Sequence, residues 1–389
     1  MVSTKKYFLN RVARHLHIVC LDIPYPADYG GSIDMFQRIV SLHDIGVKIH
    51  LHYFDYKGIS DTSVLSGYCE TINAYNRKTG IKGFSITTPY IVASRNNKSL
   101  VENLNKDSHP VFIEGVHCAG IIPSIQKAER KIVVRLHNDE SDYYKGLYNS
   151  EKSYFRKSYF LYESILLKKF QHHLPQNCLY LCVTDADLEK FRTVYKLKNV
   201  QKMPSFLPWQ EVKGKEGKGN FCLYHGNLSI CENEKAAIWL LDKVFRKIKL
   251  PFIIAGKGPS KSLDKIAHLC KHTCLVANPS EEEINDLIQK AHINILPSFN
   301  TTGLKLKLLH ALFEGRHCVV NDAAVDGTGL ADTCHIGNSA TELADIVSQL
   351  YDVPFQEEEL ELRREIFCNS YNNTKSADWL NQWLFGHYQ

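Results

Sequence analysis

The sequence predicts an α/β protein made of two doubly wound parallel-sheet domains that face each other across a cleft. Short apolar runs alternate with longer helical patterns twice along the chain. These runs are apolar throughout, as in strands that are covered on both faces of a parallel sheet. The length of 389 residues suits two domains.

Ten apolar runs are expected to form the strands of the two sheets. In the first half they are 17–23, 48–54, 110–115, 131–138 and 179–184, and in the second half 220–227, 251–258, 273–278, 293–298 and 316–322. The helical patterns between them lie near 32–45, 96–105, 150–173, 233–247, 259–270, 280–291, 305–314 and 339–351. We expect right-handed connections that place these helices on both faces of each sheet.

A segment rich in proline, glycine and lysine, 203–221, is typical of a linker. We therefore expect a first domain over 1–207 and a second over 208–374. The remaining residues, 375–389, have an aromatic amphipathic pattern that predicts a helix. This helix is expected to cross back to the first domain, because its apolar face must be buried.

Composition narrows the class of protein. Apolar residues make up 44% and charged residues 23% of the chain, which is typical of a globular protein. The net charge of +5 fits an anionic small ligand or a membrane surface, and is too small and scattered to favour nucleic acid. The twelve cysteines, several within strand-like runs, fit reduced thiols. With no apolar run of spanning length and no clear signal segment, we expect a cytoplasmic protein.

The stretch "TGLKLKLLHALFEGRHCVV" predicts an anion site at the start of a helix. Backbone N–H groups of Gly303 and Leu304 would point outward at the positive end of the helix dipole. Lys305 and Lys307 would add full charges beside them, and a diphosphate is the natural partner. The alternative is that the two lysines only solvate an exposed helix face.

Three glycine loops after strands predict further contacts with a phosphate or ribose. Gly30 and Gly31 follow the first strand and precede a helix expected at Ser32. Gly226 and Asn227 repeat this arrangement in the second domain, and "IAGKGPS" does so after the next strand. Each could instead be an ordinary turn between a strand and a helix.

Polar side chains at the ends of first-domain strands predict sugar recognition, which uses acids, amides and aromatic faces. They are Glu114, His117, Arg135, His137, Asn138 and Glu140. The alternative is that they are hydrogen-bonded core residues at strand ends.

Two other features favour the less specific interpretation. The histidines and cysteines of "HLCKHTC" lack two separated ligand pairs, so we expect no metal site there. The pattern of 151–170 combines an apolar stripe with lysines and arginines, which could lie on an anionic membrane but is more often core.

With these residues in hand, the chain resembles GT-B glycosyltransferases, most closely the large retaining family 4 and a Bacteroidetes-type subgroup of it. The resemblance rests on "IPYPADYGGSIDMFQRIVSL", "FIEGVH", "VVRLHNDESDYYKGL", "GNLSICENEKAAIWLL", "FIIAGKGP" and "ILPSFNTTGLKLKLLHALFEGRHCVVN", in that order. It implies two Rossmann-like domains and transfer of a sugar from a nucleotide-sugar donor to a glycan or lipid-linked glycan acceptor, as in polysaccharide biosynthesis.

The resemblance also implies roles for individual residues. The base would lie near Val276, Ala277 and Asn278, the ribose near His310, and the diphosphate near Gly303, Leu304, Lys305 and Lys307. His137 matches the cleft histidine that contacts the transferred sugar, and the first domain would hold the acceptor. The leaving phosphate would take the acceptor's proton, so neither a protein base nor a metal cofactor is implied.

The chain departs from the family pattern at several positions. Thr302 and His310 occupy the places of two glutamates that the family commonly carries, and Asn227 and Glu232 stand where an arginine and a lysine are common. Two alternatives therefore stay open: an inactive relative that serves as a binding subunit, and a nucleotide-sugar 2-epimerase.

Overall fold

The computed structural model describes residues 13–27, 29–55, 61–127, 129–299 and 305–386. Two compact units make up the chain. The first comprises Met1–Cys182, Lys190–Phe206 and Asn373–Gln389, and the second comprises Val183–Glu189 and Leu207–Asn372.

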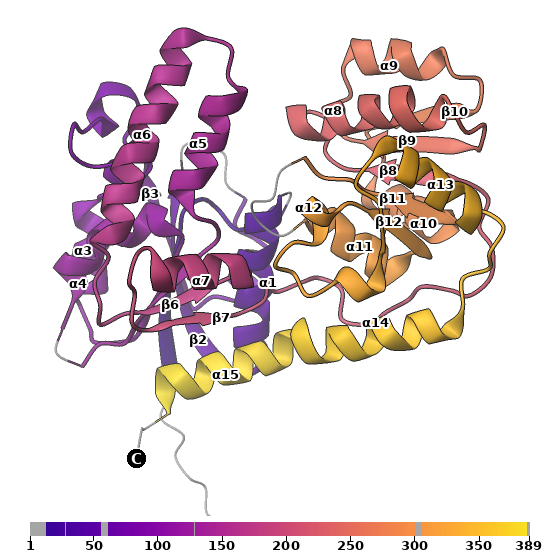
Figure 1. Ribbon diagram of the computed structural model, residues 1–389. Coiled ribbons are helices and arrows are strands. Elements are labelled where there is room, and N and C mark those ends of the chain that lie inside the picture. The colour runs from indigo at the N-terminus through magenta and orange to yellow at the C-terminus, as the bar shows by residue number, and fades with distance from the viewer. Residues whose placement is uncertain (1–12, 28, 56–60, 128, 300–304, 387–389) are drawn as a thin grey trace, which may run out of the picture. The chain divides into compact units, whose positions relative to one another are not determined.

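The first unit contains a seven-stranded parallel sheet in the order β3-β2-β1-β4-β5-β6-β7 (Figure 1). Its strands are β1 (Arg14–Cys20), β2 (Val47–Asp55), β3 (Thr71–Asn76), β4 (Val111–Glu114), β5 (Ile132–Leu136), β6 (Leu179–Cys182) and β7 (Val200–Lys202). Its helices are α1 (Gly30–Asp44), α2 (Tyr90–Ala93), α3 (Lys98–Leu104), α4 (Ile122–Ile125), α5 (Glu140–Ser150), α6 (Tyr154–His172) and α15 (Asn373–Phe385), with 3₁₀ turns η1 (Leu65–Gly67), η2 (Gly80–Gly83) and η3 (Val116–Ile121). Helix α7 (Asp185–Thr193) begins in the segment grouped with the second unit and ends in the first.

The second unit contains a six-stranded parallel sheet in the order β10-β9-β8-β11-β12-β13. Its strands are β8 (Cys222–His225), β9 (Phe252–Gly256), β10 (Thr273–Ala277), β11 (Ile293–Ile295), β12 (His317–Val320) and β13 (His335–Ile336). Its helices are α8 (Cys231–Trp239), η4 (Leu240–Phe245), α9 (Lys261–His268), α10 (Glu281–Lys290), α11 (Leu306–Glu314), α12 (Asp322–Val325), η5 (Ala331–Thr333), α13 (Ala340–Leu350) and α14 (Glu357–Ser370). Two parallel-sheet α/β units therefore confirm the predicted fold class.

Helix α15, at the end of the chain, packs on the first unit. Its Ala377, Leu380 and Leu384 are buried in the same apolar cluster as residues of α1 and the central strands. Polar contacts hold the two sides of this junction together: Arg14 Nη1 donates to Asn381 Oδ1 at 2.6 Å. Burial of an apolar stripe, rather than helix propensity, thus explains where this segment goes.

None of the described helices combines the length and the apolar character that a bilayer-crossing helix requires. The longest of them, α6, has nineteen residues and carries several charged side chains.

Candidate functional site

The strand order of the second unit creates a point where consecutive connections diverge. The chain leaves β8 toward β9 on one side, and β11 lies on the other side of β8. In open α/β sheets ligands bind at the carboxyl ends of strands at such a point. The loops that follow β8 and β11 are therefore the first place to look for a ligand site.

Lys307 lies at this point and is turned inward. Its Nζ donates to Asn233 Oδ1 at 3.0 Å and to the Tyr224 hydroxyl at 3.1 Å, and lies 4.7 Å from the centre of the Tyr224 ring. Burial, together with the nearby charge of Lys305, lowers the pKa of Lys307 to about 8, although Glu232 acts in the opposite direction. The interpretation that Lys307 merely solvates an exposed helix face is therefore wrong.

A small pocket of about 60 Å³ brings both lysines together with residues that follow the two strands. Lys305 and Lys307 line it from the start of α11, Glu232 and Asn233 from α8, and Ser298 from the segment after β11. Burial also lowers the pKa of Lys305, with Glu232 opposing. Two ammonium groups in a confined, partly buried space favour an anion as ligand.

The expected contacts of Thr302, Gly303 and Leu304 lie outside the described residues. Helix α11 begins at Leu306, and Lys305 is the residue that precedes its first turn. The sequence places both lysines correctly at a helix start, and their side chains line one pocket.

The glycine loop after β8 lies directly against Lys307. A Cβ atom on Gly226, whose φ is +153°, would lie 3.6 Å from Lys307 Cδ and 3.6 Å from Asn233 Nδ2. Asn233 Nδ2 in turn donates to the Asn227 carbonyl oxygen at 2.9 Å, while the Asn227 side chain accepts from Ser229. Asn227 thus shapes the loop through its own contacts.

A histidine that the sequence analysis did not single out, His225, ends β8 beside this pocket. It is 3% exposed, and its Nε2 atom lacks a hydrogen-bond partner among the described residues. Burial, then the neighbouring His310 and Lys307, lower the pKa of His225 well below its ordinary value. His225 is therefore a buried, neutral imidazole next to Lys307 and His310.

His310 does not lie free for a ribose. Its Nε2 lies 2.6 Å from Asn285 Oδ1, and its ring stacks on Trp209 with centroids 4.4 Å apart. Burial lowers the pKa of His310 to about 4, so the ring is neutral at pH 7. A neutral ring stands where the family commonly carries a carboxylate.

The three residues expected near the nucleotide base lie at the end of β10 and immediately after it. Val276 and Ala277 are the last residues of that strand, and Ala277 is exposed. Asn278 has a positive φ of +52°, and its Oδ1 accepts from the Gly258 N–H at 2.8 Å. The side chain of Asn278 therefore stabilises the loop after β9 through this hydrogen bond.

In the first unit, two of the polar residues expected to face an acceptor, Glu114 and Arg135, belong instead to a buried ionic network. Arg38 Nη2 pairs with Asp34 Oδ2 at 2.5 Å, and Arg38 Nη1 pairs with Glu114. Arg135 Nε lies 3.2 Å from Asp34 Oδ2, and its Nη1 donates to the Met203 carbonyl oxygen at 2.5 Å. The side chains of Arg38, Glu114 and Arg135 are all 0% exposed. The acceptor-contact role expected for Glu114 and Arg135 is therefore replaced by a positioning role.

The network holds Asp34 as a carboxylate. Burial alone would raise its pKa, but the guanidinium groups of Arg135 and Arg38 outweigh burial and hold the pKa of Asp34 well below its usual range. The backbone N–H of Phe206 also donates to Asp34 Oδ1 at 2.7 Å. Two arginines and two acids thus balance their charges inside the unit.

His137 is the member of this group that reaches solvent, with 14% of its side chain exposed. Its Nε2 lies 3.1 Å from Glu114 Oε2, and its Nδ1 lies 3.8 Å from Asp34 Oδ2. A Cβ on Gly115, whose φ is +79°, would lie 2.9 Å from His117 Nδ1 and 3.6 Å from His137 Cδ2. Gly115 therefore lets His117 and His137 lie together at the end of β4.

The remaining first-unit candidates fall into two groups. Glu140 is 5% exposed in the first turn of α5, and Asn138 is half-buried in the preceding turn. Helix α1 begins at Gly30, not at Ser32, because Ser32 Oγ accepts from the Tyr29 N–H and closes the first turn. Gly30 and Gly31 thus contribute first-turn N–H groups after β1.

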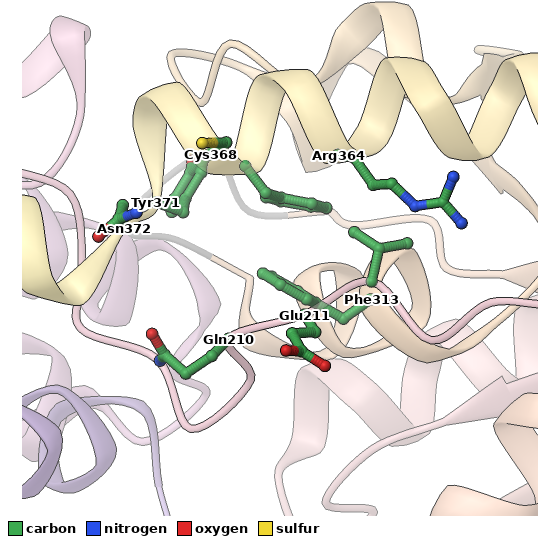
Figure 2. A pocket seen from close by; sticks show the side chains of 9 residues that line it. Gln210, Glu211, Phe313, Arg364, Cys368, Tyr371 and Asn372 are labelled. Carbon is green, nitrogen blue, oxygen red and sulfur yellow. The ribbon is translucent and has the colours of Figure 1, made fainter.

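A larger cavity of about 370 Å³ lies elsewhere in the second unit (Figure 2). It is lined by Phe313 from the end of α11, by Arg364 from α14 and by Tyr371, the residue that follows α14. Gln210 and Glu211 complete the lining. Helix α11 runs back from the carboxyl ends of the strands, so this cavity lies away from the two lysines. Size alone therefore does not mark the ligand site.

Several residues of both sites escaped the sequence analysis. Asp34 and Arg38 lie four residues apart on α1, just after the first glycine loop. This spacing of an acidic and a basic residue could have indicated an ion pair. Asn233 and Trp209 carried no such signal, because only the folded chain brings them to Lys307 and His310.

Comparisons with known proteins agree with this geometry. Residues 219–352 match the sequence model of the family described as glycosyl transferases group 1. This stretch of the second unit is therefore similar to group 1 glycosyl transferases. That match covers the strands, helices and loops of the Lys307 pocket.

Whole-chain comparisons show the fold. A Klebsiella pneumoniae "Uncharacterized 44.6 kDa protein in cps region" is 27% identical over 331 residues, which cover 80% of this chain and 84% of that protein. Sucrose-phosphate synthase from Thermosynechococcus elongatus has a TM-score of 0.65 at 12% identity and covers 95% of this chain and 98% of its own. A mutant of S. aureus TarM, in complex with fondaparinux, alpha-GlcNAc-glycerol and UDP, has a TM-score of 0.63 at 12% identity, covering 96% and 100%. The chain thus has the GT-B fold of glycosyltransferases.

Proposed function

We propose that this chain transfers a glycosyl group from a nucleotide-sugar donor to a glycan or lipid-linked glycan acceptor. The observation that carries this proposal is the pair of partly buried lysines, Lys305 and Lys307, at the switch point of a group 1 glycosyl transferase domain. Their lowered pKa values mean that burial destabilises the charged form of both lysines. An anionic ligand would stabilise that charged form.

The diphosphate of the donor is the ligand that this pocket would take. As the glycosidic bond to the leaving group breaks, negative charge grows on the departing phosphate. Ammonium groups fixed beside that phosphate stabilise the transition state more than the ground state. In this proposal the lysines supply the positive charge for which other transferases use a divalent ion.

His137 is the residue that we assign to the transferred sugar. The buried carboxylates of Asp34 and Glu114 lie beside its two ring nitrogens and orient the ring. The 14% of the His137 side chain that is exposed is where a sugar would contact the ring. The resemblance to retaining family 4 supports a mechanism in which the leaving phosphate, rather than a protein base, receives the acceptor's proton.

One observation favours a second candidate, a binding subunit without transfer activity. The neutral ring of His310, bonded to Asn285 and stacked on Trp209, cannot accept two ribose hydroxyls as a glutamate carboxylate can. A weakened grip on the donor is the expected consequence. Transfer measured with pure protein distinguishes the two candidates.

We also propose that the acceptor is presented at an anionic membrane surface. Exposed apolar side chains on α6 and on the segment 81–86 lie among lysines and arginines in the first unit. The Tyr162 hydroxyl donates to the Ile86 carbonyl oxygen at 2.6 Å, which joins the two segments. A lipid-linked acceptor would be presented at such a surface.

The test measures donor binding and transfer in the wild type and in Lys307→Met. Thermal unfolding against UDP-, GDP- and ADP-sugars should show one nucleotide that raises Tm, because a ligand of the native state stabilises it by mass action. We expect Lys307→Met to lower the rate of transfer by about 100–1,000-fold, the effect of losing one group that stabilises the leaving anion.

The matched control is Lys261→Met, which removes an exposed lysine from the start of α9. It should bind and react like the wild type. Equal nucleotide binding by Lys307→Met and the wild type would refute the proposed donor site. Conversion of the donor sugar to its 2-epimer without any acceptor would instead favour the epimerase alternative.

A further inference from the structure

Three side chains that are distant in sequence converge at the amino-terminal edge of the second unit's sheet. His317 begins β12, His335 begins β13, and Glu359 lies in the first turn of α14. Because Val319 pairs with His335, the side chains of His317 and His335 lie on the same face of the sheet. One ligand atom from each of the three lies within 4.8 Å of the others.

The hydrogen bond of His317 decides which of its nitrogens faces this cluster. His317 Nε2 lies 3.0 Å from the Val353 carbonyl oxygen, which can only accept, so Nε2 carries the proton. In the neutral ring the Nδ1 lone pair is then directed at His335 and Glu359. Metal-binding histidines are oriented in the same way, by donating the other ring N–H to a carbonyl oxygen.

Two of the three separations between the ligand atoms match those expected around a zinc ion. His317 Nδ1 lies 3.3 Å from His335 Nε2 and 3.6 Å from Glu359 Oε2, and His335 Nε2 lies 3.8 Å from Glu359 Oε2. All three distances exceed the usual hydrogen-bond range of about 2.7–3.2 Å. Zinc bonds of about 2.0–2.2 Å in a tetrahedron place neighbouring ligand atoms roughly 3.3–3.6 Å apart.

A histidine cluster in the first unit shows what hydrogen bonds alone produce. His17 Nδ1 and His52 Nε2 are 2.9 Å apart, and His52 Nδ1 lies 2.9 Å from the Tyr75 hydroxyl. His17 Nε2 lies 3.1 Å from both oxygens of Asp107. Both ring nitrogens of His17 and of His52 thus have a partner at hydrogen-bond distance, and the rings leave no gap for an ion.

We propose that His317, His335 and Glu359 bind one zinc ion, with water as the fourth ligand. His317 is 1% exposed, while the side chains of His335 and Glu359 are 35% and 34% exposed, so water reaches the open position. Two imidazoles and one carboxylate are a ligand set that zinc takes. The ion would fasten the two-residue strand β13 and the start of α14 to β12.

This site is separate from the donor pocket. Strands β12 and β13 run parallel, and both histidines stand at their first residues, whereas the lysine pocket lies at the carboxyl ends of β8 and β11. The proposal therefore does not depend on sugar transfer.

The experiment titrates the full-length chain, treated with a chelator and dialysed, with Zn²⁺ and with Co²⁺. We expect one equivalent of Zn²⁺ to bind, to raise Tm, and to compete with one equivalent of Co²⁺, whose tetrahedral complex absorbs visible light. His335→Gln and Glu359→Gln should each weaken the affinity by at least about 100-fold, the upper end of the loss expected for an orienting partner alone. Both side chains are partly exposed, so both variants should fold.

Two controls assign the signal to this cluster. Glu358→Gln changes the exposed neighbour of Glu359 on the same helix, and His268→Gln changes a surface histidine of "HLCKHTC". Both should bind Zn²⁺ as tightly as the wild type. A protein that shows no stoichiometric Zn²⁺ binding, or one whose affinity is unchanged in His335→Gln and Glu359→Gln, would overturn the proposal.

Discussion

Lys307 combines two requirements that conflict. Its ammonium group must be charged to hold an anion, yet burial in the pocket lowers its pKa to about 8. An unperturbed lysine has a pKa of about 10.4. The folded protein therefore binds fewer protons at this residue than the unfolded chain does between these two values.

The sign of the resulting pH dependence follows from linkage. Because the unfolded state binds more protons in this window, the free energy of unfolding should rise with pH as Lys307 loses its charge in the folded state. Comparing the wild type with Lys307→Met cancels the other groups. We expect the difference to move in favour of the wild type by about 1–3 kcal/mol between pH 7 and pH 10, measured by urea unfolding. A difference that is flat across this range would contradict the shift.

Single residues also mark the limit of what the sequence reveals about the site. The charge of Lys305 and Lys307 and their place at a helix start follow from spacing alone, and both line the pocket. The sequence shows that Glu114 and Arg135 lie at the ends of strands, but not that they face the interior and neutralise Asp34 and Arg38. Such pairing is decided by contacts between distant segments, which a local pattern does not contain.

The same contrast holds for whole elements. Ten of the strands overlap the apolar runs expected for them, because most of these strands are buried on both faces. Three strands were missed: β3 (Thr71–Asn76), β7 (Val200–Lys202) and β13 (His335–Ile336). All three lie at an edge of a sheet, where a strand can be short or polar, so their formation depends on a neighbour rather than on an apolar run.

The close approach of two connections in the second unit gives a prediction at this scale. Gly256 ends β9, and a Cβ atom there would lie 1.9 Å from the Gly226 carbonyl oxygen and 2.9 Å from Leu228 Cγ. Gly256→Ala must therefore displace the loop after β8, which contacts Lys307. We expect a loss of about 1–3 kcal/mol in the free energy of unfolding, the usual effect of overpacking, together with weaker nucleotide binding.

The matched variant for this prediction is Gly67→Ala, since a Cβ on Gly67 would meet nothing within 4 Å. It should change stability by less than about 0.5 kcal/mol. Equal stability and equal nucleotide binding in Gly256→Ala and Gly67→Ala would show that the two connections do not constrain the pocket.

At the scale of the molecule, the two units carry different chemistry. The second unit holds the lysine pocket, and the family match falls within it. The first unit holds the buried network beneath His137 and, on α6, a surface with large exposed apolar side chains. The sequence pattern of α6 left open whether its stripe is core or membrane-facing, and the structure divides it: Leu166 is buried, while Phe155 is 92% exposed.

The exposed part of that stripe is the basis of the last prediction. Phe155, Tyr154 and Ile81 are 92%, 86% and 93% exposed, and Lys152 and Arg156 are exposed beside the two aromatic side chains. Apolar side chains surrounded by basic ones are typical of a surface that lies in an anionic lipid interface.

We expect the full-length chain to sediment with vesicles that contain anionic phospholipid and not with vesicles of neutral lipid alone. Phe155→Ser together with Ile81→Ser should weaken this binding by at least about 10-fold, because burial of each apolar side chain contributes roughly 1.5–3 kcal/mol when complete. Leu269→Ser is the control, since Leu269 is 77% exposed in the second unit and lies outside this surface. If the double variant sediments as the wild type does, the apolar side chains of α6 do not enter the bilayer, and the acceptor must be presented to the first unit from solution.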